Sequence, residues 1–178
     1  MDKILFLDVD GVLNNETWAG EMWDDYNIKV YNKNILYQPA LVQLRRIINA
    51  TGAKIVVSSS WRKIHDAYQD LLRWLDMYGM NVLDTTSKTT SRYRQIRGDD
   101  IGEWLNAHPG VESYAILDDD DDMGEHMNHL IRTNMYYGLT EEKANACIDL
   151  LNGKSANRQQ LNGNDGQSDS SNERIGRL

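Results

Sequence analysis

The apolar residues of the chain gather in short runs of strand length, and stretches with helical spacing separate these runs. Continuous apolar runs at residues 3–7, 53–57 and 113–117 predict strands that are buried on both faces of a sheet. Shorter runs at 80–83 and 130–131 predict two more strands. Because strands and helices alternate, we expect a parallel sheet with helices on both faces, which is a three-layer α/β fold.

Helical spacing of the apolar residues predicts four helices, over residues 39–51, 63–78, 98–108 and 140–151. Pro39 suits the first turn of the first helix, and Gly52 suits its C-terminal cap. Thr140 is expected to cap the last helix, whose first turn is acidic. The buried stripe of the second helix is expected to begin at Ile64.

Three segments lack this periodicity. Residues 14–38 form a polar and aromatic insertion, which we expect to be a loop or a small flap. Residues 84–93 are polar and rich in Ser and Thr, so a loop is expected there. Residues 153–178 have almost no large apolar side chains and cannot bury enough surface to offset their ordering entropy. The sequence therefore predicts one domain over residues 1–152, followed by a disordered polar tail.

Composition narrows the classes of protein that the chain could be. Its 178 residues are enough for one domain with a substantial core. A formal net charge of -8 argues against bulk binding to nucleic acid or to an acidic membrane surface. Cys147 is the only cysteine, which excludes an internal disulfide and favours a reducing, cytoplasmic setting. The apolar run near the N-terminus is too short to span a membrane, so no membrane partner is expected.

The first strand run ends directly at Asp8, and Asp10 and Gly11 follow. Ligands of open α/β sheets gather at the carboxyl ends of the strands, which would place Asp8 at the edge where chemistry occurs. Two carboxylates this close repel each other unless a cation or a proton is shared between them. Magnesium resolves that conflict because it takes oxygen ligands. The competing interpretation is a solvated turn, since Asp and Gly are common turn formers.

Polar clusters follow two further strand runs, namely three serines at residues 58–60 and five aspartates at residues 118–122. Strands of a parallel sheet point the same way, so these clusters can converge with Asp8 at one edge. Acid, hydroxyl and acid, each directly after an apolar strand, are hard to explain by folding alone. The sequence therefore indicates a polar site built from three strand ends.

Phosphoryl transfer gives each of these clusters a task. Asp8 would attack phosphorus and form an acyl phosphate that water later hydrolyses. Asp10 would protonate the leaving oxygen and then activate that water. One of the serines would donate a hydrogen bond to the phosphoryl oxygens. Asp118, with Asp119 as a further candidate, would hold magnesium opposite Asp8.

A cationic side chain is also needed, because the transferred phosphoryl group is negatively charged. Arg97 is the first candidate, since it directly precedes the helix that leads into the strand before Asp118. Arg94 is the second candidate, and a solvated basic surface is the alternative for both. Arg62, just past the serines, could meet a phosphate or cap the aspartate run. Residues 120–122 are expected to favour the N-terminus of a following helix.

The remaining aromatic and imidazole side chains receive structural interpretations. His65 lies near the serines but within a predicted helix, where a surface position is expected. Trp61, Trp74 and Trp104 are expected to lie in the core.

These motifs resemble those of the haloacid dehalogenase-like (HAD) phosphohydrolases. The first motif matches residues 8–13, Asp-Val-Asp-Gly-Val-Leu. The second, a hydroxyl residue that ends a strand, matches Ser59 best, with Ser60 as the alternative. The third, a Lys or Arg, matches Arg97, although Lys is common there. The fourth, an acidic pair after a strand, matches residues 118–119.

The resemblance covers about residues 3–152 and extends to the HAD domain of Swiss Army Knife RNA-repair proteins. It implies a Rossmann-like fold, a Mg²⁺ cofactor bound by Asp8, Asp10 and residues 118–119, and phosphomonoester hydrolysis through an aspartyl-phosphate. Gly11, Ser60, Arg62 and Arg94 would then contact the substrate.

The insertion at 14–38 is too short for a full cap domain, and an open site admits bulky substrates. We therefore expect a nucleotide or the phosphorylated end of a nucleic acid. Basic residues between 88 and 97 agree with that class. The alternatives are a phosphoprotein or small-metabolite phosphatase, and a signalling module that binds phosphate or metal without turnover. The sequence makes no prediction of oligomeric state.

Overall fold

The structure is a computed structural model that describes residues 2–16, 36–86 and 96–154. Most of the predicted flap, the candidate Arg94, and the predicted tail beyond residue 154 lie outside the described residues.

The described strands form one five-stranded parallel sheet, which confirms the predicted α/β class. The strand order is β3-β2-β1-β4-β5, so the N-terminal strand is central and the strands that end in polar clusters flank it. The strands are β1 (Asp2–Leu7), β2 (Lys54–Val57), β3 (Val82–Thr85), β4 (Val111–Asp118) and β5 (Leu130–Arg132).

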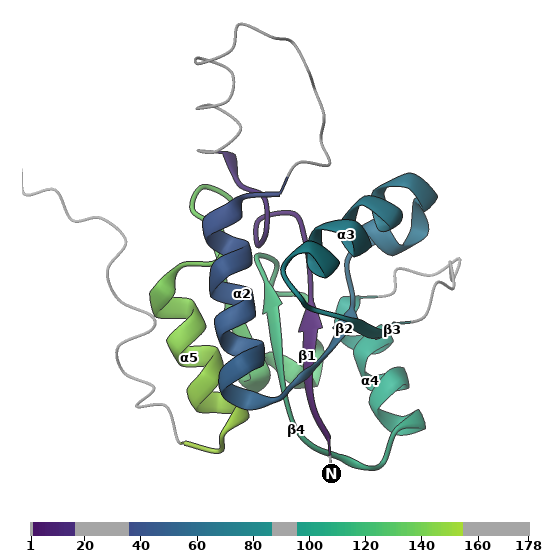
Figure 1. Cartoon of the computed structure of the whole chain (residues 1–178). Coiled ribbons are helices and arrows are strands. Elements are labelled where there is room, and N and C mark those ends of the chain that lie inside the picture. The colour runs from purple at the N-terminus through teal and green to yellow at the C-terminus, as the bar shows by residue number, and fades with distance from the viewer. Residues whose placement is uncertain (1, 17–35, 87–95, 155–178) are drawn as a thin grey trace, which may run out of the picture.

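Helices cover both faces of this sheet. In the described part of the chain, the α-helices are α2 (Gln38–Thr51), α3 (His65–Met77), α4 (Arg97–Ala107) and α5 (Glu141–Leu151). Two short 3₁₀ helices, η1 (Ser60–Lys63) and η2 (Gly124–His129), follow β2 and β4. Helices α2 and α5 lie side by side over one face of the sheet (Figure 1).

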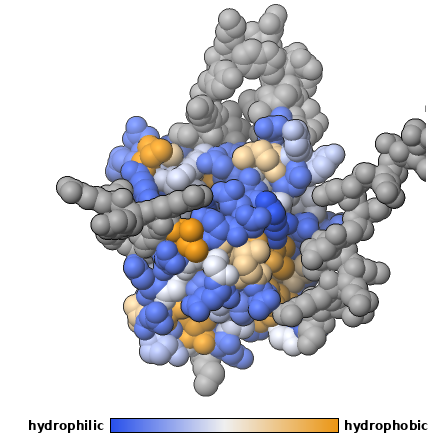
Figure 2. Space-filling model, turned by 180° about the vertical axis from the view of Figure 1, so that it is seen from behind, coloured by the Kyte–Doolittle hydropathy of each residue, from blue (hydrophilic) through white to orange (hydrophobic). Residues whose placement is uncertain are grey.

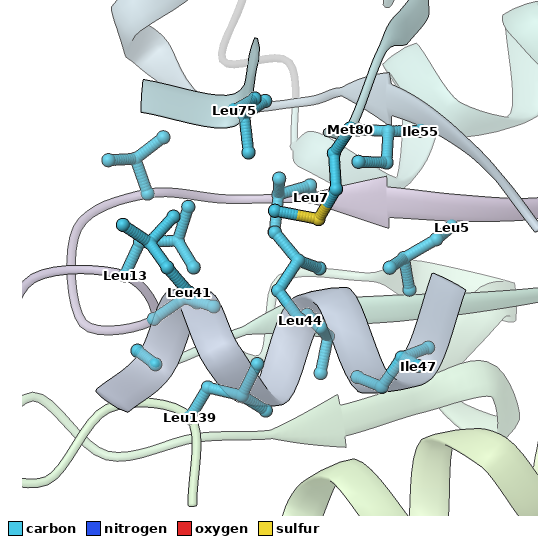
Figure 3. Close-up of a cluster of buried hydrophobic side chains, with 14 of the residues drawn as sticks. Leu5, Leu7, Leu13, Leu41, Leu44, Ile47, Ile55, Leu75, Met80 and Leu139 are labelled. Carbon is cyan, nitrogen blue, oxygen red and sulfur yellow. The ribbon is translucent and has the colours of Figure 1, made fainter. Parts of the chain in front are cut away.

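Alternation along the strands divides the core into two layers. Leu5 and Leu7 point to the face that α2, α3 and α5 cover. There they pack against α2 residues such as Leu44 (Figure 3). Phe6 points to the opposite face, where it meets Trp104 of α4 edge-on with ring centroids 5.5 Å apart. Every second residue of β1 therefore faces α4, and this alternation continues to the end of the strand.

The predicted helix ends are confirmed where the sequence carries a cap. Gly52 ends α2 with a φ of 69°, a left-handed conformation that suits glycine. The Thr140 side chain caps α5 by accepting a hydrogen bond from the Lys143 backbone N–H over 3.3 Å. In the described ranges, no helix is long and apolar enough to cross a bilayer. The surface seen from behind is mostly hydrophilic, with apolar residues scattered over it (Figure 2).

Two local predictions are wrong. Helix α3 begins at His65 rather than near residue 63, because the preceding residues form η1. Ile64 consequently lies between the two helices and is 58% exposed, not buried. Residues 84 and 85 belong to β3 rather than to a loop. The polar side chain of Asp84 is accommodated in the strand because it accepts a hydrogen bond from the Trp104 indole N–H over 2.7 Å.

Candidate active site at the carboxyl edge of the sheet

The register of the three central strands brings polar residues into one row. Leu7 of β1 pairs with Val57 of β2 and with Leu117 of β4. The backbone pairing continues one step further, because Asp8 N–H donates to the Leu117 carbonyl over 3.0 Å and Ser58 N–H donates to the Leu7 carbonyl over 3.0 Å. Asp8 therefore has Ser58 beside it on one neighbouring strand and Asp118 on the other.

This row faces helix α4. Phe6, Val56 and Ile116 belong to the core layer under α4, and the row residues Asp8, Ser58 and Asp118 follow them by two positions. All three row residues are buried. Arg97, the first residue of α4, contacts two members of the row, Asp8 and Asp118.

Three carboxylates meet at this edge. One oxygen from each of Asp8, Asp118 and Asp119 lies within 4.8 Å of the others. The convergence of the two acidic motifs, expected from parallel strands, is thereby confirmed. Gly11 has a φ of 68°, and a Cβ there would lie 2.5 Å from Asp119 Cγ. Only glycine lets the Asp119 carboxyl approach this loop so closely.

Arg97 is the cation of the site. Its Nη1 lies 2.7 Å from Asp8 Oδ1 and 2.9 Å from Asp118 Oδ2. Among the described residues, neither Arg97 Nη1 nor Asp118 Oδ2 has a well-aligned hydrogen bond, so these contacts are ionic. Burial opposes the charged form of Arg97, but Asp8 and Asp118 outweigh it and raise the Arg97 pKa above its ordinary value. The guanidinium thus stays charged between the two carboxylates.

An acid of the aspartate run positions Arg97. The Asp122 carboxylate accepts a hydrogen bond from the Arg97 backbone N–H over 3.0 Å, and the Asp122 carbonyl accepts one from Gly98 N–H over 3.1 Å. Asp122 therefore supports the N-terminus of α4, which precedes it in the chain. We expected residues 120–122 to favour the N-terminus of a helix that follows them. For Asp122 this is wrong, because the helix it supports comes earlier in the chain.

The site carries more negative charge than Arg97 neutralises. Burial raises the pKa of Asp118 to about 8, and the neighbouring Asp8 carboxylate contributes in the same direction. Burial also raises the pKa of Asp119, with Asp120 and Asp8 adding to the shift. Three carboxylates with one guanidinium leave a surplus of negative charge that a proton or a metal cation can neutralise.

Asp10 is held apart from this group of oxygens. Its Oδ2 accepts a hydrogen bond from the Trp61 indole N–H over 3.0 Å, and its Oδ1 accepts one from Asn14 Nδ2 over 2.8 Å. The carboxylates that could share an ion among the described residues do not include Asp10, so the expected metal coordination by Asp10 finds no support there. Each Asp10 oxygen keeps a further lone pair that can hold a proton.

The three serines have different surroundings. Ser58 lies in the row, and its buried Oγ has no hydrogen-bond partner in the described part of the chain. Ser59 Oγ accepts the Trp61 backbone N–H over 3.3 Å and caps η1, while Ser60 is exposed at the start of η1. The register therefore favours Ser58 as the hydroxyl next to Asp8, ahead of the sequence candidates Ser59 and Ser60.

The family model described as "HAD domain in Swiss Army Knife RNA repair proteins" matches residues 4–144, which contain both acidic motifs, Arg97, strands β2 to β5 and all but the first two residues of β1. The chain belongs to this family. No curated protein matches it.

One solved structure similar to this HAD domain is described as "Structure of Pnkp1/Rnl/Hen1 complex". The two share 18% sequence identity with a TM-score of 0.43, over 79% of this chain and 48% of that chain. The HAD domain thus spans about half the length of the solved chain. Similarity at this level carries no argument about activity.

The acidic cluster of the HAD domain fits a divalent cation. HAD domains generally use one, and carboxylate oxygens are the ligands that hard cations prefer. Asp8, Asp118 and Asp119 supply such oxygens, and no described residue gives the buried Asp118 Oδ2 an aligned donor. These residues are the ones that would hold the ion, consistent with a HAD phosphohydrolase.

Arg62 of the HAD domain has neither of the two roles considered from the sequence. Its Nη2 lies 2.7 Å from Asp100 Oδ2 in the first turn of α4, and its Nη1 donates to the carbonyls of Ser58 and Ser59. Burial lowers the pKa of Arg62, and Asp100 opposes that shift. Arg62 therefore joins the serine loop to α4, rather than capping the aspartate run or presenting its guanidinium to a phosphate.

Sequence patterns missed three residues of the site. Ser58 carried no signal that separates it from its two serine neighbours. Trp61 was expected in the core, and it is buried as expected, but it also donates to Asp10. A tryptophan a few residues after a strand end is a usable signal, because a buried indole N–H needs an acceptor. Asn14 is part of the insertion and has no sequence signal of its own.

Proposed function

We propose that this HAD domain is a magnesium-dependent phosphomonoesterase that works through a phosphoryl-Asp8 intermediate. The observation that carries the proposal is the meeting of Asp8 and Asp118 with Arg97 at the buried end of the central strands, with Asp10 two residues after Asp8. A nucleophile, an acid–base group and a counter-charge are the parts that phosphoryl transfer needs.

In the first step, an Asp8 carboxylate oxygen attacks phosphorus. The new bond from Asp8 to phosphorus forms as the bond from phosphorus to the leaving oxygen breaks. Asp10 gives its proton to that oxygen, so that an alcohol rather than an alkoxide departs. Asp10 is then a carboxylate.

In the second step, Asp10 takes a proton from a water molecule, which attacks the phosphorus of the acyl phosphate. The bond from phosphorus to Asp8 breaks, inorganic phosphate leaves, and both carboxyl groups return to their starting states. One residue thus serves first as acid and then as base.

The transferring phosphoryl group needs charge stabilisation. Arg97 contacts Asp8 directly, so its guanidinium lies next to the place where phosphorus would be attacked. The Ser58 hydroxyl has no hydrogen-bond partner among the described residues and is available to donate to a phosphoryl oxygen. When bound by Asp8, Asp118 and Asp119, Mg²⁺ supplies neutralising charge and an orientation for the phosphoryl oxygens.

We further propose a nucleotide or a phosphorylated nucleic-acid end as the substrate. The description of the family as a domain of RNA repair proteins supports this class. Exposed aromatic residues also support it, since Tyr137 is 66% exposed in the loop between β5 and α5. That loop contacts the first motif, because Leu139 N–H donates to the Val12 carbonyl over 2.9 Å. Aromatic side chains near such a site can stack on a base.

The decisive experiment compares Asp8→Asn with the wild type on a generic aryl phosphate. We expect Asp8→Asn to abolish hydrolysis while its circular dichroism and melting temperature stay near those of the wild type. Asp121→Asn is the control, because Asp121 is an exposed acid of the aspartate run 118–122 that pairs with Arg132 on the surface. Equal activity in Asp8→Asn would exclude the phosphoryl-Asp8 route.

Two further measurements define the cofactor and the substrate. Chelation followed by addition of Mg²⁺ should abolish and then restore turnover. A panel of mononucleotides, phosphorylated oligonucleotides, sugar phosphates and phosphopeptides should show the highest kcat/KM for the first two groups. If the protein binds beryllofluoride but does not release phosphate over repeated turnovers, it would instead be a binding module.

A further inference from the structure

The Asp10 carboxylate accepts a hydrogen bond at each of its oxygens. Trp61 Nε1 donates to Oδ2 over 3.0 Å, and Asn14 Nδ2 donates to Oδ1 over 2.8 Å. The amide of Asn14 is itself oriented, because its Oδ1 accepts the Gly11 backbone N–H over 3.1 Å. The carbonyl end of that amide therefore faces Gly11, and the NH₂ end faces Asp10.

Both partners of Asp10 can only donate. An indole N–H has no acceptor capacity, and the oriented amide presents its NH₂ group. When Asp10 carries a proton, neither Trp61 nor Asn14 can accept it. The proton must then occupy a lone pair that points away from both of them.

We propose that Trp61 and Asn14 are positioning residues that direct the Asp10 proton toward the leaving oxygen of the substrate. This inference rests on the proposed function, in which Asp10 is the general acid and base. The two N–H donors fix the carboxyl plane, so its remaining lone pairs keep one direction through both steps. Such fixed geometry is the way a supporting residue contributes to proton transfer.

The fold holds Trp61 firmly enough for this role. Trp61 is only 6% exposed and belongs to η1, and its backbone N–H donates to the cap hydroxyl of Ser59. The next residue, Arg62, joins η1 to Asp100 of α4. The indole therefore cannot shift without moving the serine loop, and it presents its N–H to Asp10 from a fixed support.

A purely structural role for the Trp61 indole makes a different prediction. A buried indole N–H needs an acceptor, and Asp10 would serve that need alone. Loss of the bond would then lower stability and reduce the hydrolysis of all substrates equally. Loss of proton direction is selective, because an alkoxide leaving group needs the proton and a stable phenolate does not.

The test is Trp61→Phe, which keeps an aromatic ring and removes the indole N–H. Trp104→Phe is the matched control, since Trp104 is also 6% exposed and also donates its indole N–H to an aspartate, Asp84 of the edge strand β3, which is not one of the three row residues. Both are assayed on an alkyl phosphate and on an aryl phosphate with a good leaving group. We expect Trp61→Phe to lower kcat for the alkyl substrate about tenfold more than for the aryl substrate, with KM nearly unchanged. Trp104→Phe should keep the wild-type ratio.

A second variant and a double-mutant cycle keep the test decisive if Trp61→Phe folds poorly. Asn14→Leu removes the other donor and should show the same selective loss. Asp10→Asn should show the largest selectivity, and Asn14→Leu should add almost nothing to it, because the two residues act as a unit. Equal losses on both substrates, or full additivity with Asp10→Asn, would overturn the inference.

Failure of the proposed function would look different. A wild-type protein without turnover, or an Asp8→Asn variant that retains it, contradicts the phosphoryl-Asp8 mechanism and the inference with it. In another outcome, the wild type hydrolyses the substrates, Asp8→Asn does not, and Trp61→Phe and Asn14→Leu lose activity without leaving-group selectivity. That outcome contradicts the positioning role only.

Discussion

Asp122 and Arg97 are joined through a helix terminus. The Asp122 carboxylate accepts the backbone N–H of Arg97 over 3.0 Å, and the side chain of that same arginine reaches Asp8 and Asp118. The first N–H groups of a helix lack intrahelical partners, and a carboxylate there also suits the helix dipole. The last acid of the aspartate run thus sets where the cation of the site stands.

Asp122→Ala should reduce both stability and activity. Loss of a helix-terminal acceptor costs about 1 kcal/mol, so the free energy of unfolding should fall by that amount. Activity should fall as well, because α4 would no longer fix Arg97 over Asp8. Urea unfolding and kcat measure the two effects. Asp121→Ala, at the exposed neighbouring position, should leave both near the wild-type values, and an equal effect there would contradict the helix-terminus role.

Gly11 and Gly52 form a matched pair for a test of the first motif. Both have a φ near 68–69°, but a Cβ at Gly52 would meet nothing within 4 Å, whereas one at Gly11 would lie 2.5 Å from Asp119 Cγ. Gly52→Ala should cost about 1–2 kcal/mol of stability, from backbone strain alone. Gly11→Ala should cost more and should also weaken Mg²⁺ binding, because Asp119 must move. Calorimetric titration with Mg²⁺ and urea unfolding test this, and equal stability losses with unchanged affinity would contradict it.

The general plan of the site could be predicted from the sequence because it depends on periodicity. Buried parallel strands are continuous apolar runs, and their carboxyl ends share one edge. The sequence alone therefore predicts that Asp8 and Asp118 lie at the same edge of the sheet. Arg97 was predicted from its place before a helix that leads into β4, and its contacts with both acids agree with that choice.

The parts that could not be predicted depend on register and on long-range contacts. Ser58, Ser59 and Ser60 are identical in type, and only the pairing of β2 with β1 shows which one stands beside Asp8. Asp122 supports a helix that lies before it in the chain, which no local signal indicates. The contact of Trp61 with Asp10 joins two strand ends across the sheet, and burial of an indole predicts an acceptor without saying which one.

Arg97→Met should make the stability of the domain depend more strongly on Mg²⁺. Without the guanidinium, Asp8 and Asp118 lose their counter-charge, so the melting temperature in a chelator should fall below that of the wild type. A bound cation replaces the missing charge, and the gain in melting temperature on adding Mg²⁺ should exceed the wild-type gain. Hydrolysis should fall about a hundredfold.

Arg73→Met is the control for that prediction, because Arg73 pairs only with Asp70 among the ion pairs of the described surface. Thermal melts of both variants, with and without Mg²⁺, make the comparison. An Arg97→Met variant whose Mg²⁺-dependent gain equals that of Arg73→Met would mean that Arg97 does not counter the acidic cluster.

His126 should make the domain less stable in mild acid. His126 is buried, and its Nδ1 lies 2.8 Å from the Tyr114 hydroxyl. Burial lowers the pKa of His126. Glu125 and Asp99 oppose that shift, and His129 adds to it. In the unfolded chain the imidazole of this histidine is protonated near pH 6.5, whereas in the folded protein it is protonated only at lower pH. Stability should therefore be unaffected above that range and fall as the pH drops below it.

Urea unfolding of the wild type and of His126→Gln from pH 7.5 to pH 5 tests this sign. The wild type should lose stability below about pH 6.5, and His126→Gln should lose less over the same interval because it has no imidazole to protonate. His65→Gln replaces a histidine at an exposed position on α3 and is the control for the number of histidines. If the free energy of unfolding of His126→Gln falls with pH as steeply as that of the wild type, the acid sensitivity arises elsewhere. The acidic cluster at the carboxyl edge of the sheet would then be the next group to test.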